Sequence, residues 1–353
     1  MQENLNAERL DNNIANNPFQ QKISELEDGQ KQRHIAIFSH VYPDADALCS
    51  CLAIKNLIQD NYKDCYADVF ISGEIDDLYS LILRDEVVNP EYRCAKYDVG
   101  IVLDCPNTSR VGESSLEILN SINPENIINI DHHATNERFG AVNYVASKCS
   151  STCEIIYLMA TNKYKWYISD KTAKELFQGI ITDTNLLQTL PINKTTFKVL
   201  AELTNSYNFD YQAIMEYYST KSLVKARIHA KALSSQRVFA DGKLITMEVN
   251  NNAIVGLNAK HEDTLGIVDM GLKLENAMVS ALFVEEEPEK VYVSLRSGGQ
   301  VHIGDIASSL GGGGGDTQAA YTKNGTLKEV KQEFIDIITP ILSQQKQNEE
   351  LIF

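Results

Sequence analysis

Aspartate and histidine residues gather at four places in this 353-residue sequence, and both residue types can bind metal ions or transfer protons. The places are His40, Asp44 and Asp46 in HVYPDADA, Asp104 in VLDCPNTSR, Asp131, His132 and His133 in IDHHAT, and Asp183 in GIITDTN. Carboxylates and imidazoles at this density repel one another or titrate unless positive charge lies between them. The natural source of that charge is a pair of divalent metal ions, so we interpret the four places as one metal site.

The types of donor atom limit which metal ions the site can bind and which reaction it can catalyse. Oxygen and nitrogen ligands without thiolate favour Mn²⁺, leave Mg²⁺ open and disfavour a closed thiolate zinc site. Two such ions about 3.5 to 4 Å apart can share a carboxylate and a hydroxide, and that hydroxide is placed for in-line attack on phosphorus. The site therefore predicts hydrolysis of a phosphate ester and not transfer to an organic acceptor.

Single residues of this set have simpler structural interpretations. Asp44 or Asp46 alone would be a helix N-cap, and Asp183 alone a carboxylate at a helix end. The DHH triplet at 131–133 is harder to explain in this way, because an aspartate and two adjacent histidines after a buried strand have little structural use. The four places together favour the metal site.

These residues lie beside predicted strands of a mostly parallel sheet. Short β-rich runs alternate with helical patterns, which is typical of an α/β domain, and they occupy 34–39, 67–71, 98–104 and 126–131. A helix that begins near Asp46 separates the first two strands. In open parallel sheets, ligands bind at the carboxyl ends of the strands, so residues at three such ends can converge on one crevice.

The second half of the sequence predicts a helical connector and then a smaller α/β domain. Helical patterns fill 150–240, and strand patterns return at 243–249, 277–285 and 290–297, with an acidic turn at 285–289, a glycine run at 311–315 and a final helix near 325–343. We expect four parts: a disordered arm at 1–17, a catalytic domain at 18–190, a helical connector at 191–240 and the smaller domain at 241–345.

The amino-acid composition limits the expected length of the substrate and the expected location of the protein. The chain has 32 Lys and Arg against 48 Asp and Glu, and its net charge of -16 is the wrong sign for binding long nucleic acid through the phosphates. We therefore expect a short substrate. No apolar run has membrane-spanning length and the N-terminus has no secretory pattern, so we expect no membrane partner and a cytoplasmic location. The seven scattered cysteines predict buried free thiols rather than a disulfide framework.

The pattern resembles the four motifs of the DHH phosphoesterase superfamily, and the resemblance covers nearly the whole chain. HxxxDxD at 40–46, Asp104 after a strand, DHH at 131–133 and Asp183 match the first domain. In the second half, SLRS at 294–297 and GGGDTQAA at 313–320 resemble the RS strand and the GGGHxxAA loop of the DHH-associated C-terminal domain. Size and layout are most similar to NrnA-type oligoribonucleases, which are also pAp phosphatases, and to relatives that cleave cyclic di-AMP or pApA.

Carried over by motif, the resemblance implies a role for each residue of the first domain. One metal would be bound by His40 and Asp44, the other by Asp46, His132 and Asp183, and the catalytic Asp104 would bridge both. His133, also catalytic, would face the substrate, where it stabilises phosphoryl oxygens or protonates the leaving group. Asp131 would orient a histidine of its own motif. Arg110 would reach a phosphate, with an exposed structural arginine as the alternative.

For the second domain, the resemblance implies binding of the substrate. Arg296 and Ser297 supply donors suited to a terminal phosphate. The backbone amides of the glycine run would approach a phosphate or a base closely, although a glycine run alone also fits a flexible turn. The glycines of the motif are Gly313, Gly314 and Gly315.

Two positions depart from the motif of that loop. Asp316 stands where the family carries His, and Tyr321 stands where a small residue usually closes the motif. An aspartate repels a phosphate unless it contacts a base, a sugar hydroxyl or a cation. We count Asp316 among the substrate-binding residues, and it leaves the identity of the nucleotide open.

The resemblance implies a Mn²⁺-dependent phosphoesterase that uses a metal-bridged hydroxide to degrade short oligoribonucleotides (nanoRNA) to mononucleotides, or to convert pAp to AMP. A cyclic di-AMP or pApA phosphodiesterase is the nearest alternative. Manganese-dependent inorganic pyrophosphatase ranks lower, because that enzyme's C-terminal domain lacks the RS and glycine-loop pair. A nucleotide sensor without turnover, a processive exonuclease on long DNA, and a homodimer of this chain also stay open.

Overall fold

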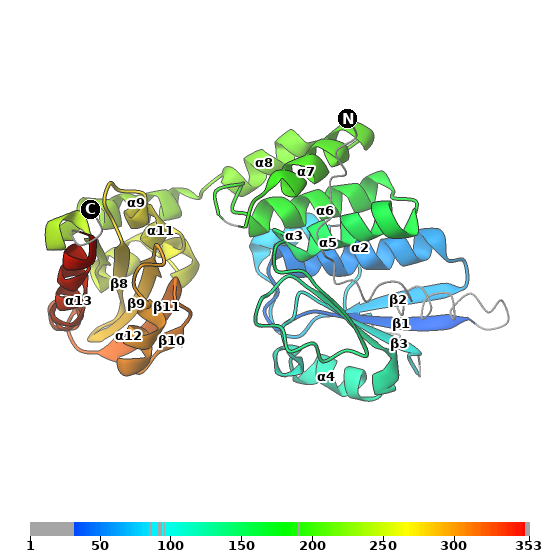
Figure 1. Ribbon diagram of the computed structural model, residues 1–353, viewed down its shortest axis with the longest axis horizontal. Coiled ribbons are helices and arrows are strands. Elements are labelled where there is room, and N and C mark those ends of the chain that lie inside the picture. The colour runs from blue at the N-terminus through cyan, green and yellow to red at the C-terminus, as the bar shows by residue number, and fades with distance from the viewer. Residues whose placement is uncertain (1–31, 85, 91–93, 95, 190, 350–353) are drawn as a thin grey trace. The chain divides into compact units, whose positions relative to one another are not determined.

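The chain forms two compact units, Met1–Thr220 and Lys221–Phe353, which are coloured blue to green and green to red in Figure 1. This computed structural model describes residues 32–84, 86–90, 94, 96–189 and 191–349. The arm predicted at 1–17 lies outside the described residues. The division between the units falls inside the predicted connector, and the four predicted domain boundaries stay predictions.

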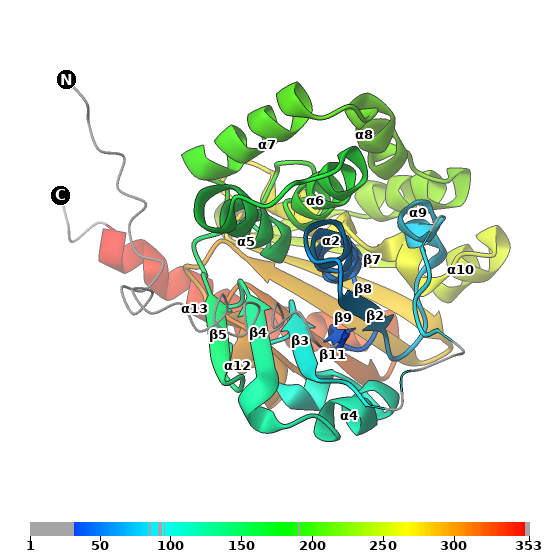
Figure 2. The ribbon, with the colours of Figure 1, turned by 90° about the vertical axis from the view of Figure 1, so that its right-hand side faces the viewer.

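The first unit is built on a five-stranded parallel sheet, and the sequence predicted four of its strands in a mostly parallel sheet. Its strands are β1 (Arg33–Phe38), β2 (Cys65–Phe70), β3 (Val99–Leu103), β4 (Ile127–Asp131) and β5 (Val142–Val145), in the order β2-β1-β3-β4-β5. Figure 2 shows β3, β4 and β5 side by side. The sequence did not predict β5, which has four residues and whose alternating pattern is too short to distinguish from a loop.

Helices cover both faces of this sheet because its strands are apolar on both sides. Ile35 and Ile37 pack into the larger core beneath α2 (Ala45–Asn61), α5 (Thr152–Leu158) and α6 (Asp170–Asp183). The alternate residues Ala36 and Phe38 face the other side, where α4 (Glu113–Asn120) closes a smaller core. Figure 1 shows α4 on the opposite face from α2.

More helices complete the first unit and begin the second. The segment Ser80–Leu83 forms α3, and a π-helical segment at Met159–Tyr164 continues α5. Helices α7 (Lys194–Ser206) and α8 (Tyr211–Ser219) place Val199, Leu203 and Ile214 in the first unit's core. The next helix, α9 (Leu223–Ser234), belongs to the second unit. The helical pattern predicted over 150–240 is confirmed up to Ser234, and a short strand, β6, occupies its end.

The second unit has a six-stranded mixed sheet, which confirms the predicted smaller α/β domain. Its strands are β6 (Arg237–Phe239), β7 (Leu244–Val249), β8 (Val279–Glu287), β9 (Lys290–Ser297), β10 (Gly313–Gly314) and β11 (Gln318–Asn324), in the order β10-β11-β9-β8-β7-β6. Only β7 and β8 are parallel. The acidic turn predicted at 285–289 is shorter than expected, because Glu285 and Glu287 still pair with β9.

Helices cover both faces of the second sheet as well. Helices α12 (Ile303–Ser309) and α13 (Leu327–Glu349) lie on the face that carries Val293 and Leu295. Helices α9, α10 (Asn251–Leu257) and α11 (Ile267–Leu272) cover the opposite face. Across the described residues, no helix is both long and apolar enough to cross a membrane.

Candidate metal centre

Three of the four acidic motifs meet at the carboxyl edge of the parallel sheet. His40 follows β1, Asp104 directly follows β3, and Asp131 is the last residue of β4. These strands are neighbours in the sheet, and their ends are level because Phe38 pairs with Val102 and Leu103 with Ile130. The strand order therefore brings together residues that lie more than 90 positions apart in the sequence.

Two carboxylates at the start of α2, Asp44 and Asp46, accept hydrogen bonds from helix amino termini. Asp44 is the N-cap of α2, and its Oδ1 accepts a hydrogen bond from the Ala47 amide at 3.0 Å. Asp46 lies in the first turn with 1% of its surface exposed. Its two carboxylate oxygens accept from the amides of Thr152 and Cys153, at 2.7 and 3.0 Å, at the start of α5. Asp46 thus links α2 to α5.

The predicted ligands form two groups, and Asp104 belongs to the first and faces His132 of the second. In each group, the potential ligand atoms lie within 4.8 Å of one another, and the groups are His40, Asp44 and Asp104, and Asp46, His132 and Asp183. His132 Nε2 lies 3.5 Å from Asp104 Oδ1 and 3.5 Å from Asp183 Oδ2. Two atoms that bind one ion at about 2.1 Å lie roughly 3 to 4 Å apart, so this spacing suits an ion between them.

The orientation of His40 also suits a metal ligand. Its Nδ1 lies 3.0 Å from the carbonyl oxygen of Val41, so this nitrogen carries the proton and donates. The other nitrogen, Nε2, then offers its lone pair towards Asp104 Oδ2, 3.8 Å away. A backbone carbonyl that fixes the tautomer of a ligating histidine is a common device in metal sites.

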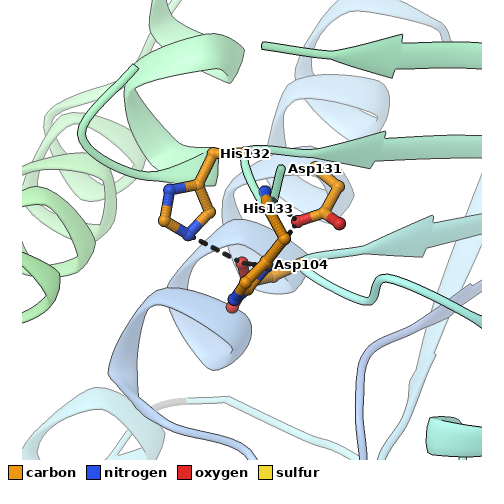
Figure 3. Close-up of side chains that lie close together, drawn as sticks. All are labelled: Asp104, Asp131, His132 and His133. Carbon is orange, nitrogen blue, oxygen red and sulfur yellow. Dashed lines mark hydrogen bonds and ion pairs between the residues drawn. The ribbon is translucent and has the colours of Figure 1, made fainter. Parts of the chain in front are cut away.

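His133 is held differently from His132, as Figure 3 shows. Its Nδ1 lies 2.7 Å from Asp131 Oδ1, and its backbone amide donates to the same oxygen at 3.1 Å. Asn136 Nδ2 donates to the second oxygen of Asp131 at 2.6 Å. Asp131 is buried, which opposes its ionisation, but these hydrogen bonds lower the pKa of its carboxyl. The hydrogen bond to Asp131 in turn raises the pKa of His133 and favours the imidazolium.

The electrostatics of the cluster call for a cation. Burial, together with the neighbouring charges of Asp46 and Asp44, raises the pKa of Asp104 well above its ordinary value. The same three causes raise the pKa of Asp183 to about 9. Carboxylates whose charge is this costly without a counter-ion are the groups that a divalent ion stabilises in the ionised form. The chemistry of the donor set therefore fits a metal site, and the identity of the metal is a separate question.

Asp104 has a strained backbone as well as a crowded side chain. Its φ of 52° lies in the left-handed region, which a non-glycine residue adopts at a cost of about 1 to 2 kcal/mol. The conformation persists because the Asp104 amide donates to Ile130 O at 3.0 Å and Thr152 Oγ1 donates to Asp104 Oδ1 at 3.0 Å. Backbone strain at the residue that belongs to one ligand group and faces the other indicates a functional constraint.

Sequence reasoning missed the residues that hold the ligands. Thr152 contacts both Asp46 and Asp104, and Asn136 fixes Asp131. The sequence showed these residues only as part of a helical segment and of a loop. For Thr152, the one signal in the sequence is its position. Ser151 and Thr152 start a helix, and the amino terminus of a helix attracts carboxylates.

Arg110 lies in a short 3₁₀ turn, Thr108–Arg110, beyond β3. Its side chain is exposed, and its carbonyl accepts a hydrogen bond from the Val41 amide at 2.6 Å. Its positive charge is near enough to act on His133, where it opposes the rise in the imidazole pKa. Its predicted contact with a phosphate stays a prediction.

The second unit has a pocket of about 310 Å³ beside β9. Arg296 lines it together with Gly313 and Gly314, and Tyr292 and Ser294 lie on the same face of β9. The Nε of Arg296 donates to Asp269 Oδ1 at 2.8 Å, so the guanidinium is held at the pocket wall. Three of the predicted substrate-binding residues thus share one pocket.

The other predicted substrate-binding residues of this unit do not line that pocket. Ser297 follows Arg296 in the strand and faces the opposite side of the sheet, where its side chain is buried. Gly315 closes the hairpin, with its amide donating to Gln318 O at 2.7 Å. Asp316 is 70% exposed at its side chain and lies 3.1 Å from His302 Nδ1. Their roles stay predictions.

The glycine run and Tyr321 have structural roles that motif comparison did not reveal. A Cβ on Gly312 would lie 2.1 Å from Ala320 O, and one on Gly314 would lie 2.4 Å from Ala319 Cα, so the two segments can pair only without side chains there. Tyr321 is 3% exposed and packs in the core beneath α12 and α13. The larger residue at this position fills core volume.

Comparison with known proteins matches both units to family models. The model of the DHH family, N-terminal domain, matches residues 34–181, and the DHHA1 domain matches residues 241–344. Residues 34–181 therefore form a DHH domain, and residues 241–344 form a DHHA1 domain. The resemblance stated from the sequence motifs is therefore confirmed, and the DHHA1 domain is the unit that carries Arg296 and the glycine hairpin.

Relatives of this chain match most of its length. A probable bifunctional oligoribonuclease and PAP phosphatase, NrnA, from Streptococcus mutans is 29% identical over 79% of this chain and 86% of the relative. A bifunctional oligoribonuclease and PAP phosphatase, NrnA, from Thermus thermophilus is 27% identical over 82% of this chain and 84% of the relative.

A solved structure has the same fold. The crystal structure of an exopolyphosphatase-related protein from Bacteroides fragilis superposes with a TM-score of 0.77 at 24% identity, covering 92% of this chain and 98% of that one. At this identity the likeness concerns the fold alone.

Proposed function

We propose that this chain is a two-metal phosphoesterase that removes mononucleotides from short oligoribonucleotides and the 3′-phosphate from pAp. The observation that carries the proposal is the position of Asp104, which belongs to one ligand group and lies 3.5 Å from His132 of the other. Two relatives that match about four fifths of this chain are named for these activities. The net charge of -16 supports a short substrate over a long one.

In this proposal, the chain's own residues hold the ions and the phosphate. His40 and Asp44 bind on one side, Asp46, His132 and Asp183 bind on the other, and Asp104 contacts both. Two divalent ions, Mn²⁺ in our proposal with Mg²⁺ as the alternative, would supply Lewis acidity and an activated water. Asp46 needs no movement to take part, because its backbone hydrogen bonds fix the carboxylate.

His133 completes the proposed site as a proton donor. Asp131 accepts the proton of Nδ1, which leaves Nε2 as the atom that can donate to a phosphoryl or leaving-group oxygen. Because the pKa of His133 is raised, more of the donor form is present at neutral pH. The Asp131–His133 pair is thus suited to protonating a leaving nucleoside oxygen.

The proposal is tested by assaying the purified full chain with short RNA, pAp, pApA and cyclic di-AMP after chelation and reloading with Mn²⁺, Mg²⁺ or Zn²⁺. We expect turnover of short RNA and pAp with Mn²⁺ and none after chelation. Calorimetry should also show Mn²⁺ binding and a raised melting temperature, which reports the site independently of turnover. Mn²⁺ binding without turnover of any of the four would contradict the enzyme and support the nucleotide sensor.

The same assay addresses the alternative substrate. Proteins named cyclic-di-AMP phosphodiesterases, from Listeria monocytogenes and Geobacillus thermodenitrificans, are 24% and 26% identical to this chain but are covered over only 47% of their length. A higher kcat/KM on cyclic di-AMP or pApA than on short RNA and pAp would replace our proposal with that activity. The cytoplasmic location and the homodimer stay predictions.

A further inference from the structure

Tyr42 is an exposed aromatic residue inside the first metal-binding motif. It lies two positions from His40 and two from Asp44, and 70% of its surface is exposed. Among the described residues, no large hydrophobic side chain is more exposed. Core packing does not explain its ring, and a metal site needs no ring at this position.

The backbone of Tyr42 is strained, which is a second and independent observation. Its φ of 53° is left-handed, a conformation that is a genuine outlier for a bulky residue. Asparagine or glycine would adopt this conformation at lower cost. The strained conformation directs the ring away from the core at the carboxyl edge of the sheet. Strain of this kind persists where surrounding structure over-determines it, and it points to function.

The surrounding loops hold Tyr42 in place. Its amide donates to Ser72 O at 3.3 Å, and the preceding amide of Val41 donates to Arg110 O at 2.6 Å. Ser72 is itself fixed by hydrogen bonds with Ser114 Oγ and the Ser115 amide. Three loops beyond β1, β2 and β3 therefore position one exposed ring.

Gly73 lies against the ring of Tyr42. A Cβ on Gly73 would lie 3.1 Å from Tyr42 Cδ1, which is tighter than an ordinary contact, and Gly73 has a φ of 84°. The Cδ1–Cε1 edge of the tyrosine ring thus lies against Gly73, and the exposed remainder of the ring is available to a ligand. A ring supported in this way loses little entropy on stacking, because its orientation is already restricted.

We propose that Tyr42 is a specificity residue that stacks on the base of the nucleotide whose phosphate lies at the metal centre. Aromatic rings stack on all four bases, because every base has a π-face, so such a contact selects nucleotides over other phosphate esters without selecting sequence. Arg110, whose carbonyl fixes the same loop, would lie beside the phosphate. The inference rests on the proposed function, since it assumes a nucleotide substrate.

The test compares pAp with ribose 3,5-bisphosphate, which has the same two phosphates and no base. The variant Tyr42→Asn removes the ring and keeps a residue that tolerates positive φ, whereas Tyr42→Phe and Tyr42→Trp keep an aromatic ring. We expect the wild type to prefer pAp in kcat/KM. Tyr42→Asn should reduce that preference by roughly 5- to 100-fold, the effect of one base–aromatic stack, while the Phe and Trp variants retain it.

The matched control is Tyr167→Ala. Tyr167 is 66% exposed, and its backbone pairs with Asn61 at the far end of the 17-residue helix α2, about 25 Å from Tyr42 along the helix axis. This control should leave the preference for pAp unchanged. Equal preferences in the wild type and Tyr42→Asn would overturn the inference and leave the phosphoesterase intact.

A binding measurement distinguishes failure of the stacking inference from failure of the proposed activity on pAp. If the Mn²⁺-loaded wild type hydrolyses neither compound, the proposed activity on pAp fails, and calorimetry with AMP and ribose 5-phosphate then tests the stack alone. Tighter binding of AMP that is lost in Tyr42→Asn would support a base platform in a nucleotide-binding protein. Equal binding of the two ligands to the wild type would overturn it.

Discussion

The carboxylates of the two units differ in burial and in what holds them. Asp46 and Asp104 of the first unit are 1% exposed, and backbone or hydroxyl donors fix their oxygens. The side chains of Asp269 and Asp316 in the second unit are 42% and 70% exposed, and each faces one cationic or imidazole partner. The first arrangement sets the positions of charges before a ligand arrives, whereas the second allows the partners to exchange for a ligand.

This difference suits a division of labour in the proposed enzyme. Metal ions need ligands at fixed separations, so the chain buries them at strand ends and helix starts. A nucleotide varies in shape, so a hairpin and an arginine at the edge of a pocket can adapt to it. The comparison predicts that substitutions in the first unit change turnover outright, and that those in the second unit mainly change substrate binding.

The largest effect is expected from Asp104→Asn. It should lower kcat on pAp at least roughly 1,000-fold, because the residue that belongs to one ligand group and faces the other loses its charge. The metal-free variant should melt at a higher temperature than the metal-free wild type, since a buried carboxylate with a strongly raised pKa is removed. Asp60→Asn, at the exposed far end of α2, is the control and should change neither measurement. Turnover that survives in Asp104→Asn would end the two-group interpretation.

A smaller effect is expected from Arg296→Gln in the second unit. It should reduce kcat/KM on nucleotide substrates by roughly 10- to 100-fold through KM, because a charged hydrogen bond to phosphate is lost. Mn²⁺ affinity measured by calorimetry should stay the same. Arg237→Gln, an exposed arginine on β6 of the same sheet, is the matched control. A loss of Mn²⁺ binding in Arg296→Gln would contradict the separation of roles.

The third prediction concerns a buried carboxylate outside the metal centre. Burial raises the pKa of Glu175 to about 8, and both of its oxygens face Asn56 Nδ2 at 2.9 and 3.0 Å. The folded state therefore holds a proton that the unfolded state loses near pH 4.5. The contribution of Glu175 to stability is present below pH 4.5 and is lost as the pH rises through about 8.

Glu175→Gln should remove this pH dependence. Relative to the variant, the wild type should lose roughly 3 kcal/mol of unfolding free energy between pH 5 and 8, measured by urea unfolding at each pH. The exposed Glu117→Gln on α4 is the control and should parallel the wild type. Parallel stability curves for the wild type and Glu175→Gln would show that Glu175 ionises normally.

The smallest effect is expected from Asp316→Asn. The exposed pair with His302 should contribute less than about 1 kcal/mol, so the melting temperature should hardly change. Removing a negative charge from the hairpin should lower KM for nucleotides by a few-fold at low salt, and added salt should abolish the difference. A large rise in KM would instead show that Asp316 contacts the substrate directly.

Most of the fold was predictable because its signals are local. The strands β1 to β4 are short apolar runs that alternate with helical patterns, and α2 begins where Asp44 caps it. The strands β5, β6 and β10 were not predicted, since four, three and two residues are too few for a pattern. The strand β11 was also not predicted, because its first residues were aligned with a loop motif. The glycines of β10 could be aligned with a motif, but the backbone contact that requires them joins segments of the folded chain.

The sequence by itself determined the ligand candidates, because an aspartate with two histidines after a buried strand is rarely a packing choice. It also determined the charge balance and the order of the domains. Only the tertiary structure decided that Asp46 binds the start of α5, that Thr152 supports Asp104, and that Ser297 faces away from Arg296. The physical reason is that these depend on strand order, pairing register and helix placement, which no short stretch of sequence encodes.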